Sequence, residues 1–346
     1  MIGQSRHFVF EMAGMSFRVY RSSVWLLTLQ CAALTMLSCL SLIQGDFPLK
    51  WTQLLSLLSN TPDTMAEFVV LDVRLPRLLA GLTAGAAFGL AGAVIQSLGG
   101  NDLASPDLIG FNAGAAIGAV LCIAVFGASG IFVAGGAVLG VLLTAALIGG
   151  LAWERNLNPN RFVLIGIGIG ATLFALVEFL LTRIALFKAD AAYRWMIGSI
   201  SAPSDFEVMV GALAIGPLLA AAVLIEPYLD RLSLGVSVAA SLGNVVRRIR
   251  IMAVVLGLLA SATAVFIVGP VAFIAFVAGP VTRSVLNRGP ALVHSSLTGS
   301  ILLVFSDLVA RTVMAPTQLP VGLCTALLGG PFLIWILTRN AKEITR

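Results

Sequence analysis

The stretch LLAGLTAGAAFGLAGAVIQSL (78–98) contains no charged residue and is long enough to cross a lipid bilayer as a helix. About 20 consecutive apolar residues are needed to span the hydrocarbon core. Gly81, Gly85 and Gly89 recur at every fourth position, and such a face lets a neighbouring helix backbone approach closely in lipid. The stretch therefore predicts a transmembrane helix that packs through glycine.

The rest of the chain has the same character. Hydrophobic residues make up 59% of its 346 residues, charged residues only 11%, and the mean hydropathy is +1.02. A soluble domain would carry about 25% charged residues, so we predict a polytopic, all-α membrane protein. About ten spans are expected, near 24–44, 78–98, 108–127, 130–153, 161–181, 207–226, 250–268, 270–287, 295–311 and 320–338.

Lys and Arg gather on one side of these spans. If the N-terminus is cytoplasmic, the inside segments hold 14 of the 21 Lys and Arg residues, which predicts an N-in, C-in topology. The net charge of +5 reflects this bias and does not indicate nucleic-acid binding. Residues 1–23 are expected to be a cytoplasmic leader with a short interfacial helix, and Met15 is an alternative start. Residues 24–346 are expected to form one permease domain.

Few residues suggest bond chemistry. Each of the four cysteines lies within an apolar span and lacks a CxxC partner, so we interpret them as buried structural thiols and predict no metal site. No GxxxxGK[ST] motif occurs, so the chain is not expected to hydrolyse ATP or to hold a cofactor. Asp307 lies four residues before Arg311 and is expected to pair with it, while Glu178 is a second intramembrane acid.

Two Gly-Pro pairs, Gly269-Pro270 and Gly279-Pro280, lie only eight residues apart. Each pair should weaken or kink a helix. Broken helices are tolerated at membrane depth where they are buried in protein or line a cavity. We therefore expect a short or re-entrant helix here.

Two connections stand out for polar residues. Arg74 and Arg77 flank Pro76 just before the 78–98 span on the outer side, where proline suits a first helical position. They could bind carboxylates of a partner or extend to lipid phosphates, and physics alone does not separate these alternatives. On the inner side, Ser105-Pro106-Asp107 predicts a helix start.

Residues 74–120, RLPRLLAGLTAGAAFGLAGAVIQSLGGNDLASPDLIGFNAGAAIGAV, resemble the signature of the iron-siderophore and vitamin B12 permeases of bacterial ABC importers. Later segments agree in order: SLG (241–243), VGPVAFIAFVAGPVTR (268–283), SDLVAR (306–311) and LPVGLCTALLGGPFLIWIL (319–337). The segment SPDLIGFNAGA (105–115) is most similar to permeases for ferric catecholate siderophores such as enterobactin.

The resemblance implies a ten-helix subunit with a vitamin B12 permease-like fold in the bacterial inner membrane. It implies a homologous permease as a homo- or heterodimer partner, two ATP-binding cassette subunits that use ATP, and a periplasmic binding protein that delivers the cargo. By the same resemblance, Arg74, Arg77 and Arg311 would receive acidic residues of that binding protein.

Residues for gating and coupling also follow from the resemblance. Asn101 and Leu103, with Pro159 and Asn160 before the fifth span, would form a cytoplasmic gate. The segment 234–250 would contact the ATPase through a coupling helix comprising Val236, Ser237, Val238, Ala239, Ala240, Ser241, Leu242 and Gly243.

The chain departs from the family pattern at several of these positions. Relatives usually carry an acidic pair and an arginine at the positions of Val236, Ser237 and Ala240, so we expect a more apolar coupling surface. Relatives also have Asn-Pro-Leu where this chain has Asn101-Asp102-Leu103. They have Pro-His where this chain has Gly279-Pro280. The leading hypothesis is a permease for a ferric catecholate siderophore; the alternatives are a cobalamin or haem permease and, from another class, an ion-coupled secondary transporter.

Overall fold

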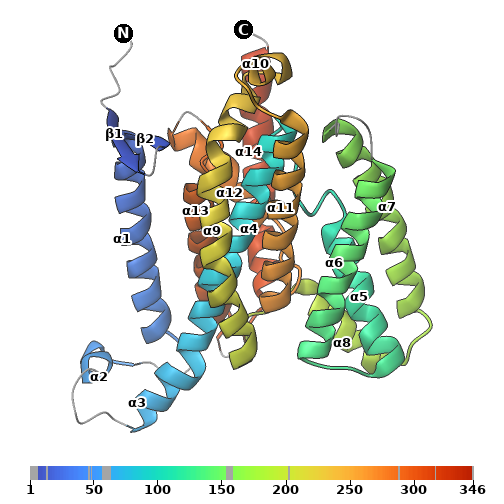
Figure 1. Ribbon diagram of the computed structural model, residues 1–346. Helices are drawn as coiled ribbons and strands as arrows, with labels where there is room; N and C mark the ends of the chain where they lie inside the picture. Colours follow the sequence, from blue (N-terminus) through green and yellow to red (C-terminus); the bar gives the residue numbers. More distant parts are fainter. Residues whose placement is uncertain are drawn as a thin grey trace.

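The computed structural model describes residues 7–12, 15–45, 47, 49–56, 64–152, 159–201, 203–286, 289–315 and 317–344. Helices dominate this part of the chain, which confirms the predicted all-α membrane fold (Figure 1). The elements are β1 (His7–Met12), β2 (Met15–Tyr20), α1 (Arg21–Ile43), α2 (Trp51–Ser56), α3 (Thr64–Phe68), the π-helical η1 (Val69–Arg74), α4 (Leu75–Gly99), α5 (Phe111–Phe126), α6 (Ile131–Leu151), α7 (Pro159–Leu181), α8 (Leu186–Ile197), α9 (Asp205–Ser233), α10 (Val236–Ser241), α11 (Val246–Val268), α12 (Ile274–Leu286), α13 (Leu292–Thr312) and α14 (Val321–Ile344).

All ten predicted spans coincide with helices, namely α1, α4, α5, α6, α7, α9, α11, α12, α13 and α14. In the described part of the chain, seven helical stretches are long and apolar enough to cross a membrane. The apolar parts of α5, α12 and α14 are shorter. The additional helix α8 lies in a connection between two spans.

The two ends of the chain lie on the same side of the bundle. Figure 1 shows both termini at the end where α10 lies, with α2, α3 and α8 at the opposite end. An even number of spans requires this arrangement, which agrees with the predicted placement of both termini on one side.

The N-terminal leader differs from the expectation of an interfacial helix. β1 and β2 form an antiparallel hairpin in which His7 is opposite Tyr20 and Met12 is opposite Met15. Phe and Val occur in both strands, and β2 also contains a Tyr; these residues favour extended structure.

Helix α4 is the centre of the main bundle. It packs against α13, α11, α12 and α9, and 89% of its most apolar window is buried. Gly85 and Gly89 lie against the backbone of α13, where an added Cβ would collide with Gly299 and Ser295 respectively. This arrangement confirms the predicted packing through the glycine face.

The predicted helix start at Pro76 is wrong. α3, η1 and α4 form one helical stretch, so that Met65–Gly99 runs for 35 residues. Pro76 lacks a backbone N–H, and its ring conflicts with the carbonyl group four residues earlier. The wider π turn of η1 lies directly before it and gives the ring room without ending the helix.

Helix α12 is short, as predicted, because irregular backbone replaces its first turns. Residues 269–273 connect α11 to α12, and Gly269 and Phe273 both have positive φ angles, of 75° and 69°. Gly269-Pro270 therefore breaks the helix, within protein rather than in lipid. Gly279-Pro280, in contrast, lies inside α12 and does not end it.

Candidate functional site

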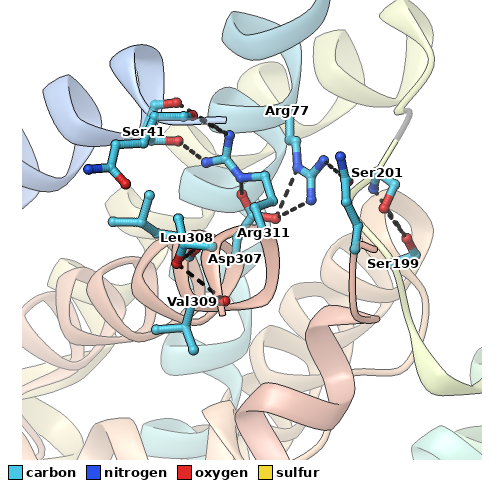
Figure 2. Close-up of polar contacts among 11 residues, drawn as sticks. Ser41, Arg77, Ser199, Ser201, Asp307, Leu308, Val309 and Arg311 are labelled. Atoms are coloured by element: carbon cyan, nitrogen blue, oxygen red, sulfur yellow. Dashed lines mark hydrogen bonds and ion pairs between the residues drawn. The ribbon is translucent and has the colours of Figure 1, made fainter. Parts of the chain in front are cut away.

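The three arginines that the resemblance assigned to docking lie close together at the outer end of α4 and α13. Asp307 connects two of them: its Oδ1 accepts from Nε and Nη2 of Arg77 at 3.0 and 2.8 Å, and its Oδ2 lies 3.1 Å from Nε of Arg311. The predicted pairing of Asp307 with Arg311 is thus confirmed. Arg77 also donates to Gln318 at 2.8 Å. Figure 2 shows the Asp307 carboxylate between the two guanidinium groups.

Two of the three arginines also hold the C-terminal end of α1. Arg74 donates to the carbonyl oxygens of Leu42 and Ile43 at 2.7 and 2.8 Å, and to that of Phe47. Arg311 donates to Ser41 Oγ at 2.7 Å (Figure 2). The last carbonyl groups of a helix have no partner within the helix and carry partial negative charge, so cations stabilise them.

All three arginines are largely buried, with exposed fractions of 5% for Arg74, 7% for Arg77 and 5% for Arg311. Arg74 and Arg77 lie within a continuous helix, so neither is at the positive end of a helix dipole. Internal acceptors hold the guanidinium groups, which supports neither lipid phosphates nor a partner's carboxylates as their sole ligands. Binding-protein docking at these residues stays a prediction.

The residues expected to form the cytoplasmic gate lie in two connections. Asn101 and Leu103 follow α4, and the Asn101 side chain accepts the Leu103 N–H at 2.9 Å. Pro159 and Asn160 are the first two residues of α7. Asn101 and Asn160 are exposed, while Leu103 and Pro159 are half-buried. Their role in gating stays a prediction.

A buried glutamine joins the α4–α5 connection to α12, and the sequence reasoning overlooked it. Gln96 Nε2 donates to the carbonyl oxygens of Asp102 and Phe276, each at 3.0 Å. Arg283 Nη2 donates to Gln96 Oε1 and to Asp102 Oδ1, each at 2.8 Å. A signal existed in the sequence, since a lone glutamine near the end of an apolar span needs partners when it is buried.

The predicted helix start at Ser105-Pro106-Asp107 is displaced. These residues form hydrogen-bonded turns, with Ser105 Oγ accepting the Leu108 N–H at 3.3 Å, and α5 begins only at Phe111. The Asp107 side chain is half-buried, and its carboxyl group accepts from Asn112 Nδ2 at 2.8 Å and from the backbone N–H of Phe273. Burial raises the pKa of Asp107 to about 7, although both hydrogen bonds lower it.

The segment expected to contact an ATPase forms the short helix α10, at the end of the bundle that holds both termini (Figure 1). Its Val236 and Val238 side chains are exposed, as are Leu234 and Leu242 on either side, while Ala239 is buried against the bundle. The apolar character predicted for this surface is therefore present.

Other candidates carry no site. Among the residues that the structure describes, no group of three or more His, Cys, Asp or Glu residues could hold a metal ion. The reading of the cysteines as buried thiols is correct only for Cys324, because Cys31 is exposed and Cys39 and Cys122 are half-buried. Faces that meet lipid need no protein cover, so an apolar span does not imply burial. Glu178 is exposed on α7.

A comparison with known families gives a match over nearly the whole chain. The model of the FecCD transport family matches residues 33–339. The chain belongs to the FecCD transport family. This confirms the family that the sequence signature indicated, and with it a transport permease with many membrane spans.

Two relatives of this FecCD protein are ferric enterobactin transport system permeases of Escherichia coli K12. FepG is 34% identical over 300 residues, which cover 86% of this chain and 91% of FepG. FepD is 34% identical over 313 residues, covering 88% and 92% of the two chains. The vitamin B12 import system permease BtuC of Vibrio cholerae is 33% identical over 285 residues, covering 80% and 85%.

A solved structure shares the fold of this FecCD protein. A metal-chelate type ABC transporter, solved in an inward-facing conformation, aligns with a TM-score of 0.82 and 24% identity. The alignment covers 91% of this chain and 99% of that one.

Proposed function

We propose that this FecCD permease carries a ferric siderophore of the catecholate class from the periplasm to the cytoplasm, across the inner membrane, as a subunit of an ABC importer. The observation that carries the proposal is the 34% identity to two ferric enterobactin permeases over most of each chain. The vitamin B12 permease is nearly as similar, so identity favours the importer class more strongly than the cargo.

The proposed importer needs partners, since the chain has no nucleotide-binding motif. We propose a second permease subunit, two ATPase subunits and a periplasmic binding protein. The exposed apolar side chains of α10 and its flanks support ATPase contact, because an apolar surface outside the membrane needs a protein cover. Binding-protein capture and ATPase closure would each favour a different state of the permease and so drive transport.

The three outer arginines carry the docking part of the proposal. Asp307 pairs with Arg77 and Arg311 at the outer end of α4 and α13. A carboxylate from the binding protein would bind these guanidinium groups through charge-assisted hydrogen bonds. The guanidinium groups would have to exchange internal acceptors for that carboxylate or share them.

An ion-coupled secondary transporter is the alternative of another class. Such transporters commonly use intramembrane acids as proton relays. Asp307 binds two arginines in this structure, which is the role of a fixed counter-ion. This observation favours the ATP-driven importer.

Uptake assays test the proposal directly. The complex of the chain with its copurified ATPase and permease partners is reconstituted in liposomes, and its binding protein is added outside. We expect uptake of labelled ferric catecholate that requires ATP, resists a protonophore and is not inhibited by excess cobalamin or haem. Inhibition by cobalamin or haem alone would reassign the cargo, and ATP-independent uptake that collapses with the proton gradient would refute the importer.

A further inference from the structure

Gln96, near the inner end of α4, joins three helical or loop segments: α4 itself, the α4–α5 connection and α12. The Gln96 side chain is only 2% exposed. Its amide binds Phe276 and Arg283 of α12 on one side and Asp102 of the α4–α5 connection on the other. A buried amide with donor and acceptor both engaged is held in one orientation.

The Gly279-Pro280 pair creates the place that Gln96 occupies. Pro280 has no N–H, so the Phe276 carbonyl four residues earlier lacks its helical partner, and Gln96 Nε2 supplies it. Gly279 supplies the room, because a Cβ at this position would collide with Gln96 Oε1. Gly279 and Pro280, which both depart from the family pattern, thus together form the binding site for the Gln96 side chain of α4.

Asp102, the third departure, completes the same joint. Its carboxylate forms an ion pair with Arg283 at 2.8 Å, and its carbonyl oxygen accepts from Gln96. Asp102 is about half exposed, and exposed ion pairs contribute little by themselves. The buried glutamine is therefore the main element of the joint, and the ion pair adds to it.

A second tether fastens the same connection to the other end of α12. Asp107 accepts the backbone N–H of Phe273, which directly precedes α12. Residues 100–110 are thus attached near both the beginning and the end of that helix. Left-handed backbone flanks it on both sides, at Gly269 and Phe273 before it and at Gly289 and Ala291 after it.

We infer that Gln96 is a positioning residue that makes the α4–α5 connection and α12 move as one body during transport. The inference rests on the proposed permease function, since it assigns the motion to the transport cycle. It gives Asp102, Gly279 and Pro280 a common purpose: they build the joint between a gate connection and a short, hinged helix.

A buried cysteine can report whether the joint is closed. Ala104 lies in the connection and is 5% exposed. In a variant that lacks the four native cysteines, Ala104→Cys is introduced and the complex with its ATPase subunits is prepared in inside-out vesicles. The rate of labelling by a membrane-impermeant maleimide is the measurement. Gln96→Leu, which keeps the size and removes the hydrogen bonds, should raise this rate at least tenfold.

A matched control uses the next residue along the chain. The Ser97 hydroxyl donates to Ala93 of its own helix, at 2.6 Å, and makes no contact of this kind with α12. Ser97→Ala should leave the labelling rate within about twofold of the reference. Arg283→Gln, which keeps the Gln96 bond to Phe276, provides a milder break and should raise the rate to an intermediate level.

A second substitution distinguishes two roles of Gln96: holding the α4–α5 connection against α12, and only supplying a hydrogen-bond donor to the Phe276 carbonyl. Pro280→Ala restores an N–H that can bond to Phe276 within α12. Added to Gln96→Leu, it should recover the thermal unfolding temperature while labelling of Ala104→Cys stays high. If labelling returns to the reference rate, Gln96 only satisfies the carbonyl and the inference is wrong.

If Ala104→Cys is labelled at the reference rate in both Gln96→Leu and Arg283→Gln, Gln96 does not link the α4–α5 connection to α12, whatever happens to uptake. With the joint open, the amount of cargo imported per ATP hydrolysed should fall at least fivefold. Because labelling needs no cargo, a wrong cargo assignment would leave the labelling result intact and would appear only in the uptake assay.

Discussion

Arg77 and Asp307 lie 230 positions apart in the chain and form a buried ion pair with a separation of 2.8 Å. The pair fixes α4 against α13 at the outer end of the bundle. Because Asp307 also pairs with Arg311, one carboxylate binds two buried guanidinium groups. This relation makes Asp307 the structural centre of the arginine cluster.

Removal of Asp307 should therefore destabilise the fold. Asp307→Ala removes the carboxylate that two buried guanidinium groups share, and breaking a buried ion pair from one side costs about 3 kcal/mol or more. Asp307→Asn, which keeps one acceptor oxygen, should cost less. Thermal unfolding in detergent is the measurement, with Asp190→Ala at the exposed pair of α8 as the control. Equal unfolding temperatures for Asp307→Ala and the control would contradict this prediction.

Arg74 should control the order of the outer end of α1. Arg74→Lys keeps the charge but cannot reach several carbonyl groups with one planar fork. Amide hydrogens near Ile43 should then exchange at least tenfold faster, as measured by hydrogen–deuterium exchange. Arg194→Lys, at an exposed pair, is the control. If docking depends on the same guanidinium group, capture of the binding protein should weaken in Arg74→Lys as well, and unchanged capture would separate the two roles.

The close approach of α4 to α12 predicts a strong effect of a single methyl group. A Cβ at Gly92 would overlap with the Ala275 carbonyl oxygen. Gly92→Ala should therefore cost about 2 kcal/mol, because overpacking forces the backbone apart. Gly168 in α7 meets nothing within 4 Å, so Gly168→Ala should be neutral or slightly stabilising. A neutral Gly92→Ala would show that the two helices do not touch here.

Asp107 should make stability depend on pH. Its raised pKa, about 7 against an ordinary value of 3.8, means that the folded state binds the proton more tightly than the unfolded state. The free energy of unfolding should therefore fall as pH rises from about 4 to about 7 and then level off. Asp107→Asn replaces the ionisable carboxyl group by an amide that stays neutral. The free energy of unfolding of the variant relative to the wild type should therefore grow across that range, by up to about 1.4 kcal/mol per pH unit.

Chemical unfolding at several pH values between 5 and 8 measures this advantage. Asp190→Asn, on the exposed side of α8, is the control and should leave the wild-type pH profile unchanged. A constant difference between Asp107→Asn and the wild type would mean that the Asp107 carboxyl group ionises normally.

Val238, one of the two exposed valines of α10, tests ATPase contact. Val238→Glu places a charge on the apolar surface expected to be covered by an ATPase, so at least tenfold less ATPase should copurify with the permease. Leu186→Glu makes a similar change on the exposed start of α8, at the opposite end of the bundle (Figure 1), and should have no effect. Equal recovery of ATPase with both variants would place the contact elsewhere.

The sequence predicted the spans well because a long apolar run has few alternatives in a bilayer. It also predicted the short α12 from Gly269-Pro270, and the Asp307–Arg311 pair from helical spacing. Gly279-Pro280 was expected to weaken or kink a helix; it lies inside α12 and does not end it. Gln96, which lies 180 positions before Phe276, donates to the Phe276 carbonyl that Pro280 cannot bind, and reasoning from the local sequence could not reveal that partner.

The same limit explains the arginines. Pro76 and the adjacent charges resemble a helix start, yet tertiary packing continues the helix upstream through a π turn. Arg74 was expected to bind a partner or lipid on the outer side, but the carbonyl groups of Leu42 and Ile43 at the end of α1, which lie 32 and 31 positions earlier, are its acceptors. Spacing within one helix could reveal Asp307 as a partner of Arg311, whereas contacts between helices could not be derived.

The unbroken stretch Met65–Gly99 has a mechanical consequence. At 1.5 Å per residue its 35 residues measure roughly 50 Å, well beyond the thickness of the hydrocarbon layer. Hydrogen bonds along the helix axis resist stretching, so a displacement beside Arg74 is transmitted along the helix to Gly100 with little loss. A displacement at one surface of the membrane can thus reach the other surface as a shift of one continuous helix.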